Sequence, residues 1–142
     1  MRQLTFILLI CATTLFGQKN GEICIGKKDS LYSNILKENR EIIVYVPQNE
    51  NPYIQTDKYP VLYLLDGDIL FAKTIGILDH LSSYYGSERC PKMIVVGIIN
   101  SNRFKDLLPI TSKDKQDSID DFTKFMEKEL IPYIDKKYPT QQ

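Results

Sequence analysis

Asp66 and Asp68 are the residues of this sequence whose type and position best suit chemistry. They flank Gly67 and follow an unbroken apolar run, Val61 to Leu65, in the stretch YPVLYLLDGD. A short apolar run bounded by turn residues is typical of a strand buried on both faces, and ligands gather at the carboxyl ends of such strands in parallel sheets. Whatever chemistry this fold carries out is therefore expected near these two carboxylates.

The elements that position this turn alternate between strands and helices. An antiparallel hairpin is predicted first, with Lys37 to Arg40 as its polar link, and the helix that comes last should kink or nearly end at Pro132. The predicted elements are strands at Ser30–Leu36, Glu41–Val46, Val61–Leu65 and Met93–Ile99, and helices at Ile69–Tyr85 and Ser118–Tyr133. The order predicts an α/β fold: an N-terminal hairpin plus two parallel strands with crossover helices.

Length and charge bound the function. The chain has 142 residues, enough for one domain, with 18 basic and 18 acidic residues. This balance favours neither nucleic acid nor an anionic membrane as a partner. No internal stretch is long and apolar enough for a transmembrane helix.

The first 17 residues have the composition of a secretory signal peptide. Arg2 precedes the apolar segment LTFILLICATTL, and the small residue Gly17 precedes a polar boundary. We expect cleavage after Gly17, an exported protein that is periplasmic or secreted, and a domain over residues 18–142. Export would permit a disulfide between Cys24 and Cys90, and the alternative is two buried free thiols.

Four blocks of the chain resemble one known family. They are DSLYSNILKENREIIVYVP, YPVLYLLDGD, PKMIVVGIINSNRFKDLLP and FMEKELIPYIDKKYPT. In this order they look like the N-terminal half of the putative esterase family of α/β-hydrolases, which includes enterochelin esterase-like, feruloyl and acetyl-xylan esterase-like enzymes. The resemblance implies a serine-dependent carboxylic ester hydrolase without a metal or organic cofactor, acting on a small-molecule, carbohydrate or siderophore ester.

The sequence departs from that family's catalytic pattern. The family places its Ser in a G-x-S-x-G elbow, with the acid and the His further along the chain. No G-x-S-x-G occurs here, and the single histidine, His80, precedes the place where the elbow would fall. We therefore expect a truncated α/β-hydrolase fold that lacks the nucleophile-elbow strand, and a chain inactive by itself.

One catalytic element is carried over from the family. Its oxyanion hole uses a backbone N–H from the loop after the strand that matches Val61–Leu65. In this sequence the donor would be the N–H of Asp68, and Gly67 would serve the tight turn. The resemblance also includes an N-x-x-R-x-x-D-x-x-P block made by Asn100, Arg103, Asp106 and Pro109, in which Arg103 and Asp106 are expected to form an ion pair or to contact substrate.

Two other interpretations stay open. A strand followed by Asp-x-Asp also begins the haloacid dehalogenase-like phosphatases, in which the first Asp attacks phosphorus, the second is the acid and base, and both surround Mg²⁺. The matching residues would be Asp66 and Asp68, but Ile69 and Leu70 stand where that family has Thr or Val. The chain could instead be a non-catalytic truncated product or half of a split protein. In the α/β-hydrolase fold the elbow strand pairs with the strand that matches Val61–Leu65. Without the elbow strand, we expect one side of Val61–Leu65 to be an unpaired sheet edge.

Overall fold

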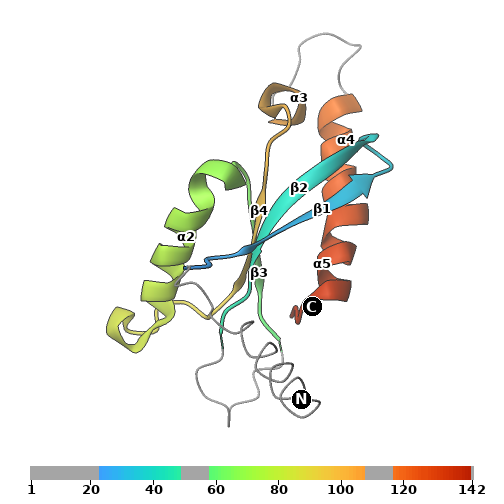
Figure 1. The fold of residues 1–142 in the computed structure, drawn as a ribbon. Coiled ribbons are helices and arrows are strands. Elements are labelled where there is room, and N and C mark those ends of the chain that lie inside the picture. Colours follow the sequence, from blue (N-terminus) through green and yellow to red (C-terminus); the bar gives the residue numbers. More distant parts are fainter. Residues whose placement is uncertain (1–22, 49–57, 108–116, 142) are drawn as a thin grey trace, which may run out of the picture.

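The computed structural model describes residues 23–48, 58–107 and 117–141 (Figure 1). Their strands form one mixed sheet in the order β1-β2-β4-β3. The strands are β1 (Lys27–Ser33), β2 (Glu38–Tyr45), β3 (Val61–Leu64) and β4 (Ile94–Ile98). The pairs β1/β2 and β2/β4 are antiparallel, and β3/β4 is parallel. The predicted hairpin and the predicted parallel pair are therefore confirmed.

Helices cover both faces of this sheet, which gives a three-layer arrangement (Figure 1). On one face lies α2 (Gly67–Ser82), the crossover between the parallel strands, followed by the short turn η1 (Tyr84–Gly86). On the other face lies a continuous helical stretch made of α4 (Asp117–Phe125), the π-turn η3 (Met126–Leu130) and α5 (Ile131–Lys137). A short helix, α3 (Arg103–Leu107), follows β4 at one end of the sheet.

The hydrophobic core is divided by β4, all five residues of which are buried. Its odd and even positions face different helices, because successive side chains of a strand point to opposite faces. Val95 packs with Phe71 and Ile75 of α2, whereas Ile94, Val96 and Ile98 join the cluster around α4 and α5. The continuous apolar run thus marks a strand covered on both faces.

The strand β3 differs from the prediction that it is buried on both faces. Its four residues are only partly buried, because β4 pairs with one side of it alone. Within the described residues, the other side carries only a parallel bridge between Tyr59 and Thr140, just before β3 begins. Tyr59 N–H donates to Pro139 O at 2.9 Å, and Gln141 N–H donates to Tyr59 O at 2.8 Å. Beyond this bridge, β3 is an edge strand of the described sheet.

The hairpin turn lies earlier than predicted, at residues 34–37, and β1 extends back to Lys27. A contact with the distant helix accounts for the shift. Glu129 of η3 accepts hydrogen bonds from Ser33 Oγ at 2.5 Å and from Asn34 N–H at 2.9 Å. Ser33 Oγ also accepts from Leu36 N–H at 2.9 Å, so the buried serine organises the turn.

The last helix continues past Pro132 to Lys137, so the expectation that it nearly ends there is wrong. The π-turn explains how the proline is accommodated. Ile131 N–H donates to Met126 O five residues back, and Pro132 then opens α5, where the N–H that it lacks is not needed.

Candidate functional site

Polar side chains meet where the two parallel strands end. Asp66 follows β3, Asn100 follows β4, and Arg103 opens α3. Asn100 Nδ2 donates a hydrogen bond to Asp66 Oδ1, and Arg103 Nε lies 3.1 Å from the same oxygen. The end of one strand is therefore tied to the end of its neighbour through a single carboxylate.

The turn that begins α2 is shaped by Asp66 and not by the glycine. Asp66 has φ 54° and ψ 42°, in the left-handed region, while no glycine among the described residues has a positive φ. The prediction that Gly67 provides the tight turn is thus wrong in its reason. Gly67 is needed because α2 starts close to β4: a Cβ on it would lie 2.6 Å from the carbonyl carbon of Gly97.

Asp68 is the second residue of α2, and its side chain is exposed. The first N–H groups of a helix have no carbonyl partner within the helix, and they carry the positive end of the helix dipole. The N–H of Asp68 belongs to this set, at the carboxyl end of β3. Its role as an oxyanion donor stays a prediction, with a location that suits it.

The expected ion pair between Arg103 and Asp106 does not form. Asp106 is 2% exposed and pairs with Arg40, whose Nη2 lies 2.6 Å from Asp106 Oδ1, while Arg103 pairs with Asp66. Asp106 lies one turn after Arg103 on α3, and its carboxylate reaches β2, which antiparallel pairing places next to β4.

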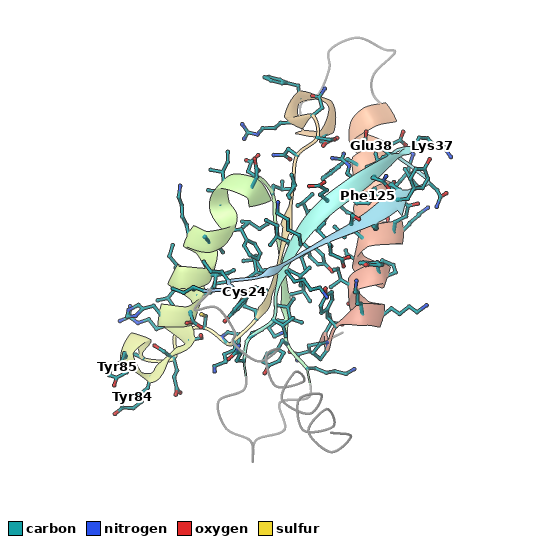
Figure 2. All side chains as sticks on the ribbon, viewed as in Figure 1. Cys24, Lys37, Glu38, Tyr84, Tyr85 and Phe125 are labelled. Carbon is teal, nitrogen blue, oxygen red and sulfur yellow. The ribbon has the colours of Figure 1, made fainter. Side chains whose placement is uncertain are left out.

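Arg40 is the residue that sequence reasoning missed. It is completely buried, with its guanidinium 5.6 Å from the centre of the Phe122 ring and 5.9 Å from that of Phe125. Arg40 Nε lies 2.9 Å from Glu38 Oε1, and Arg40 Nη1 donates to Ser101 Oγ at 3.0 Å. In Figure 2, Glu38 is labelled on β2 and Phe125 on α4, the helix that covers this face of the sheet.

A signal for Arg40 existed in the sequence. In β2, the buried positions are Arg40, Ile42 and Val44, which is the alternation of a half-buried strand. Placing Arg40 in the hairpin link hid this period, because the predicted strand began at Glu41, three residues after the start of β2.

The single histidine lies away from this site. His80 is exposed in the last turn of α2, 12 residues after Asp68, which corresponds to about 18 Å along a helix axis. A cavity of about 430 Å³ lies at the same far end of the sheet, lined by Val46, Gln48 and Lys92 among others. Neither feature reaches the Asp68 N–H.

The remaining candidates are reported as the structure places them. Cys24 and Cys90 are free thiols, the first exposed and the second half-buried. In the described part of the chain, no three His, Cys, Asp or Glu residues form a group that could hold a metal ion, and no helix there is long and apolar enough to cross a membrane. The predicted signal peptide and Pro109 lie outside the described residues.

Two parallel strands joined by a crossover helix, with an anchored turn at their carboxyl edge, define a mixed α/β fold that matches part of the α/β-hydrolase structures. Residues 33–142 match the family described as Putative esterase, and the chain belongs to this family. Among curated proteins, it is 30% identical over 86 residues to the uncharacterised protein YbbA of Bacillus subtilis (strain 168), covering 59% of this chain and 32% of YbbA.

Solved structures agree with this assignment. An IroE-like serine hydrolase from Shewanella oneidensis is 33% identical with a TM-score of 0.67, covering 81% of this chain and 39% of the hydrolase. A CE1 ferulic acid esterase from Anaeromyces mucronatus, in complex with ferulic acid, is 22% identical with a TM-score of 0.58. The match covers 88% of this chain and 47% of the esterase. The enterobactin esterase FES from Shigella flexneri, in the presence of enterobactin, is 19% identical with a TM-score of 0.61. The match covers 89% of this chain and 29% of FES. The chain therefore spans less than half the length of each of these relatives.

Proposed function

We propose that this chain forms the N-terminal half of a serine-dependent carboxylic ester hydrolase, and that it is inactive without the part that supplies the nucleophile. The observation that carries the proposal is the turn Asp66–Asp68 at the carboxyl end of β3, in a chain of the Putative esterase family. In the proposed enzyme, the N–H of Asp68 donates to the oxyanion of the tetrahedral intermediate. One such donor is worth about 3 kcal/mol of transition-state stabilisation.

The bridge between Tyr59 and Thr140 indicates where the nucleophile-elbow strand of the proposed enzyme would pair. Residues 139–141 run parallel to the chain at Tyr59, on the side that β4 does not occupy. A strand that continued in this direction beside β3 would draw level with Asp66 after roughly seven more residues. A serine on the turn after that strand would then face the N–H of Asp68, which is the arrangement that an acyl transfer requires.

The substrate of the complete protein is proposed as a carboxylic ester. Support comes from the ferulic acid and enterobactin esterases among the matched structures, which are named for esters of aromatic or siderophore compounds. We also propose export, on the basis of the apolar segment within residues 1–17. The N-terminal residue of the mature protein tests this: Gln18 is expected, and secreted protein that retains Met1 would contradict it.

A non-catalytic role for the isolated chain is favoured by a specific observation. The 142 residues contain no G-x-S-x-G, and His80 lies at the far end of α2 from Asp68. The phosphatase interpretation has no such support, because the carboxylate of Asp66 is engaged by Asn100 and Arg103 and the family match is to esterases.

The test compares two polypeptides with a fluorophosphonate probe and with p-nitrophenyl acetate. One is the 142-residue chain, and the other includes any coding sequence that follows codon 142. We expect the first to remain unlabelled and inactive, and the second to be labelled on one serine. Stoichiometric labelling of a serine in the 142-residue chain would overturn the proposal, and Mg²⁺-dependent phosphatase activity lost in Asp66→Asn would favour the phosphatase.

A further inference from the structure

The carboxylate of Asp66 is used in an unusual way for a residue that precedes a helix. An Asp at this position ordinarily accepts a hydrogen bond from the N–H of the second or third helical residue. Asp66 makes no such side-chain cap. Its Oδ1 instead accepts from Asn100 Nδ2 and lies 3.1 Å from Arg103 Nε, across the gap between the two strand ends.

The backbone of Asp66 is in the left-handed region, with φ 54° and ψ 42°. A left-handed backbone is uncommon for a residue other than glycine and persists where the surroundings determine it. The carbonyl of Asp66 accepts from the N–H groups of both Ile69 and Leu70 at 3.0 Å, which leaves the N–H groups of Gly67 and Asp68 directed beyond the helix. Rotation of Asp66 would therefore redirect the Asp68 N–H.

We infer that Asn100 and Arg103 are positioning residues, which hold the left-handed turn at Asp66 and thereby aim the Asp68 N–H at the reacting ester. This inference rests on the proposed function and adds two residues to it. Neither Asn100 nor Arg103 touches the oxyanion in this scheme; both act through the Asp66 carboxylate.

Arg103 can hold Asp66 because α3 is itself anchored. Asp106, one turn after Arg103, is bound to the buried Arg40 with a separation of 2.6 Å between Nη2 and Oδ1. Ser101 hydroxyl contacts the same guanidinium, with 3.0 Å between Oγ and Nη1. Removal of the Arg103 side chain alone leaves this buried anchor intact, which makes Arg103 a cleaner test than Asp106.

The first test measures amide hydrogen exchange at Ile69 and Leu70 in the polypeptide that includes any coding sequence after codon 142, because these N–H groups bond to the carbonyl of Asp66. The arginine of the ion pair between Arg103 and Asp66 is 66% exposed, so its loss predicts about two- to fivefold faster exchange in Arg103→Gln. We expect Arg103→Lys to restore much of the protection. Lys124→Gln is the control, since it removes an exposed ion pair with Asp121 that is remote from the turn.

A second pair of variants separates backbone from side chain. Asp66→Gly permits the left-handed backbone but lacks the carboxylate, whereas Asp66→Asn tolerates that backbone and keeps an acceptor for Asn100. We expect fast exchange at Ile69 and Leu70 in Asp66→Gly and intermediate exchange in Asp66→Asn. Equal protection in Asp66→Gly and the unsubstituted chain would overturn the inference, as would a rise spread evenly over all amides.

The kinetic arm uses the complete enzyme that carries the nucleophile. Misdirection of one oxyanion donor predicts that Arg103→Gln lowers kcat by about 10- to 100-fold with little change in KM. Lys124→Gln should leave both constants unchanged. An active enzyme whose kcat survives Arg103→Gln and Asp66→Gly would overturn the inference alone, whereas an inactive unsubstituted enzyme would overturn the proposed function and leave the exchange result standing.

Discussion

Replacing Gly67 by Ala places one methyl group between the start of α2 and the backbone of β4. The added Cβ would lie 2.6 Å from the carbonyl carbon and 2.8 Å from the Cα of Gly97, and 2.8 Å from the N of Ile98. All three are backbone atoms of a fully buried strand, so no side-chain rotation can relieve the contact. Such overpacking typically costs about 1–3 kcal/mol of stability.

Gly76 offers a matched control on the same helix. It is exposed in α2, and a Cβ added there would meet nothing within 4 Å. Since Ala is about 1 kcal/mol better than Gly in a helix interior, Gly76→Ala should stabilise the protein. Gly97→Ala should be intermediate, because its closest neighbour is the Phe71 ring at 2.8 Å, which can move in part.

Urea unfolding followed by circular dichroism, at one protein concentration for all variants, measures these changes in the polypeptide that includes any coding sequence after codon 142. Residues 18–142 alone are expected to lack the cooperative transition that the measurement requires. We expect the free energies of unfolding of Gly67→Ala and Gly76→Ala to differ by roughly 2–4 kcal/mol, with the former lower. Equal midpoints for these two variants would show that α2 does not approach β4 as closely as described.

Three further predictions concern charge and the sheet edge. Asp106→Asn should destabilise the fold by about 3 kcal/mol in the same urea assay, because the buried guanidinium of Arg40 loses its buried carboxylate partner and keeps only the partly exposed Glu38; a change under 1 kcal/mol would contradict this. Burial alone would raise the pKa of Asp29, but hydrogen bonds from Lys137 and the Tyr133 hydroxyl lower it overall. Its stabilising contribution is therefore present above the unfolded pKa of about 4 and lost as the pH falls through the lower folded value. Acid unfolding of Asp29→Asn should show a flatter pH dependence below pH 4, and an unchanged profile would refute the assignment. Finally, residues 18–142 expressed alone should associate or unfold non-cooperatively, because Val61–Leu64 has an unpaired edge in the described sheet; size-exclusion chromatography showing a monodisperse monomer with a sharp urea transition would contradict this.

Local patterns in the sequence were enough for the order of elements. The apolar runs at Ile94–Ile98 and Val61–Leu64 are short, unbroken and bounded by turn residues, and this pattern predicted two strands. The structure has both strands, paired in parallel. The helix after the Asp66 turn also lies close to its prediction. These features depend on residues near each other in the chain, and they locate the candidate site at the start of α2.

Predictions failed where distant segments decide the outcome. The hairpin turn is organised by Glu129, almost a hundred residues away from Ser33, and a local reading of turn residues could not include it. The helix through Pro132 survives because the π-turn before it supplies a different hydrogen-bond pattern, which propensity alone does not show. The residues of β3 are only partly buried because, in the described sheet, β4 pairs with one side of this strand alone.

The sequence by itself determined the family, the alternation of strands and helices, and the turn at which the candidate oxyanion donor lies. Only the tertiary structure decided which charges pair there. Arg103 and Asp106 have the spacing of a local pair, yet Arg103 binds Asp66 and Asp106 binds Arg40. The physical reason is that strand pairing brings the start of β2 to the same edge of the sheet as the carboxyl ends of β3 and β4. A buried charge then takes the partner that the sheet places within hydrogen-bonding distance, however far away that partner lies in the sequence.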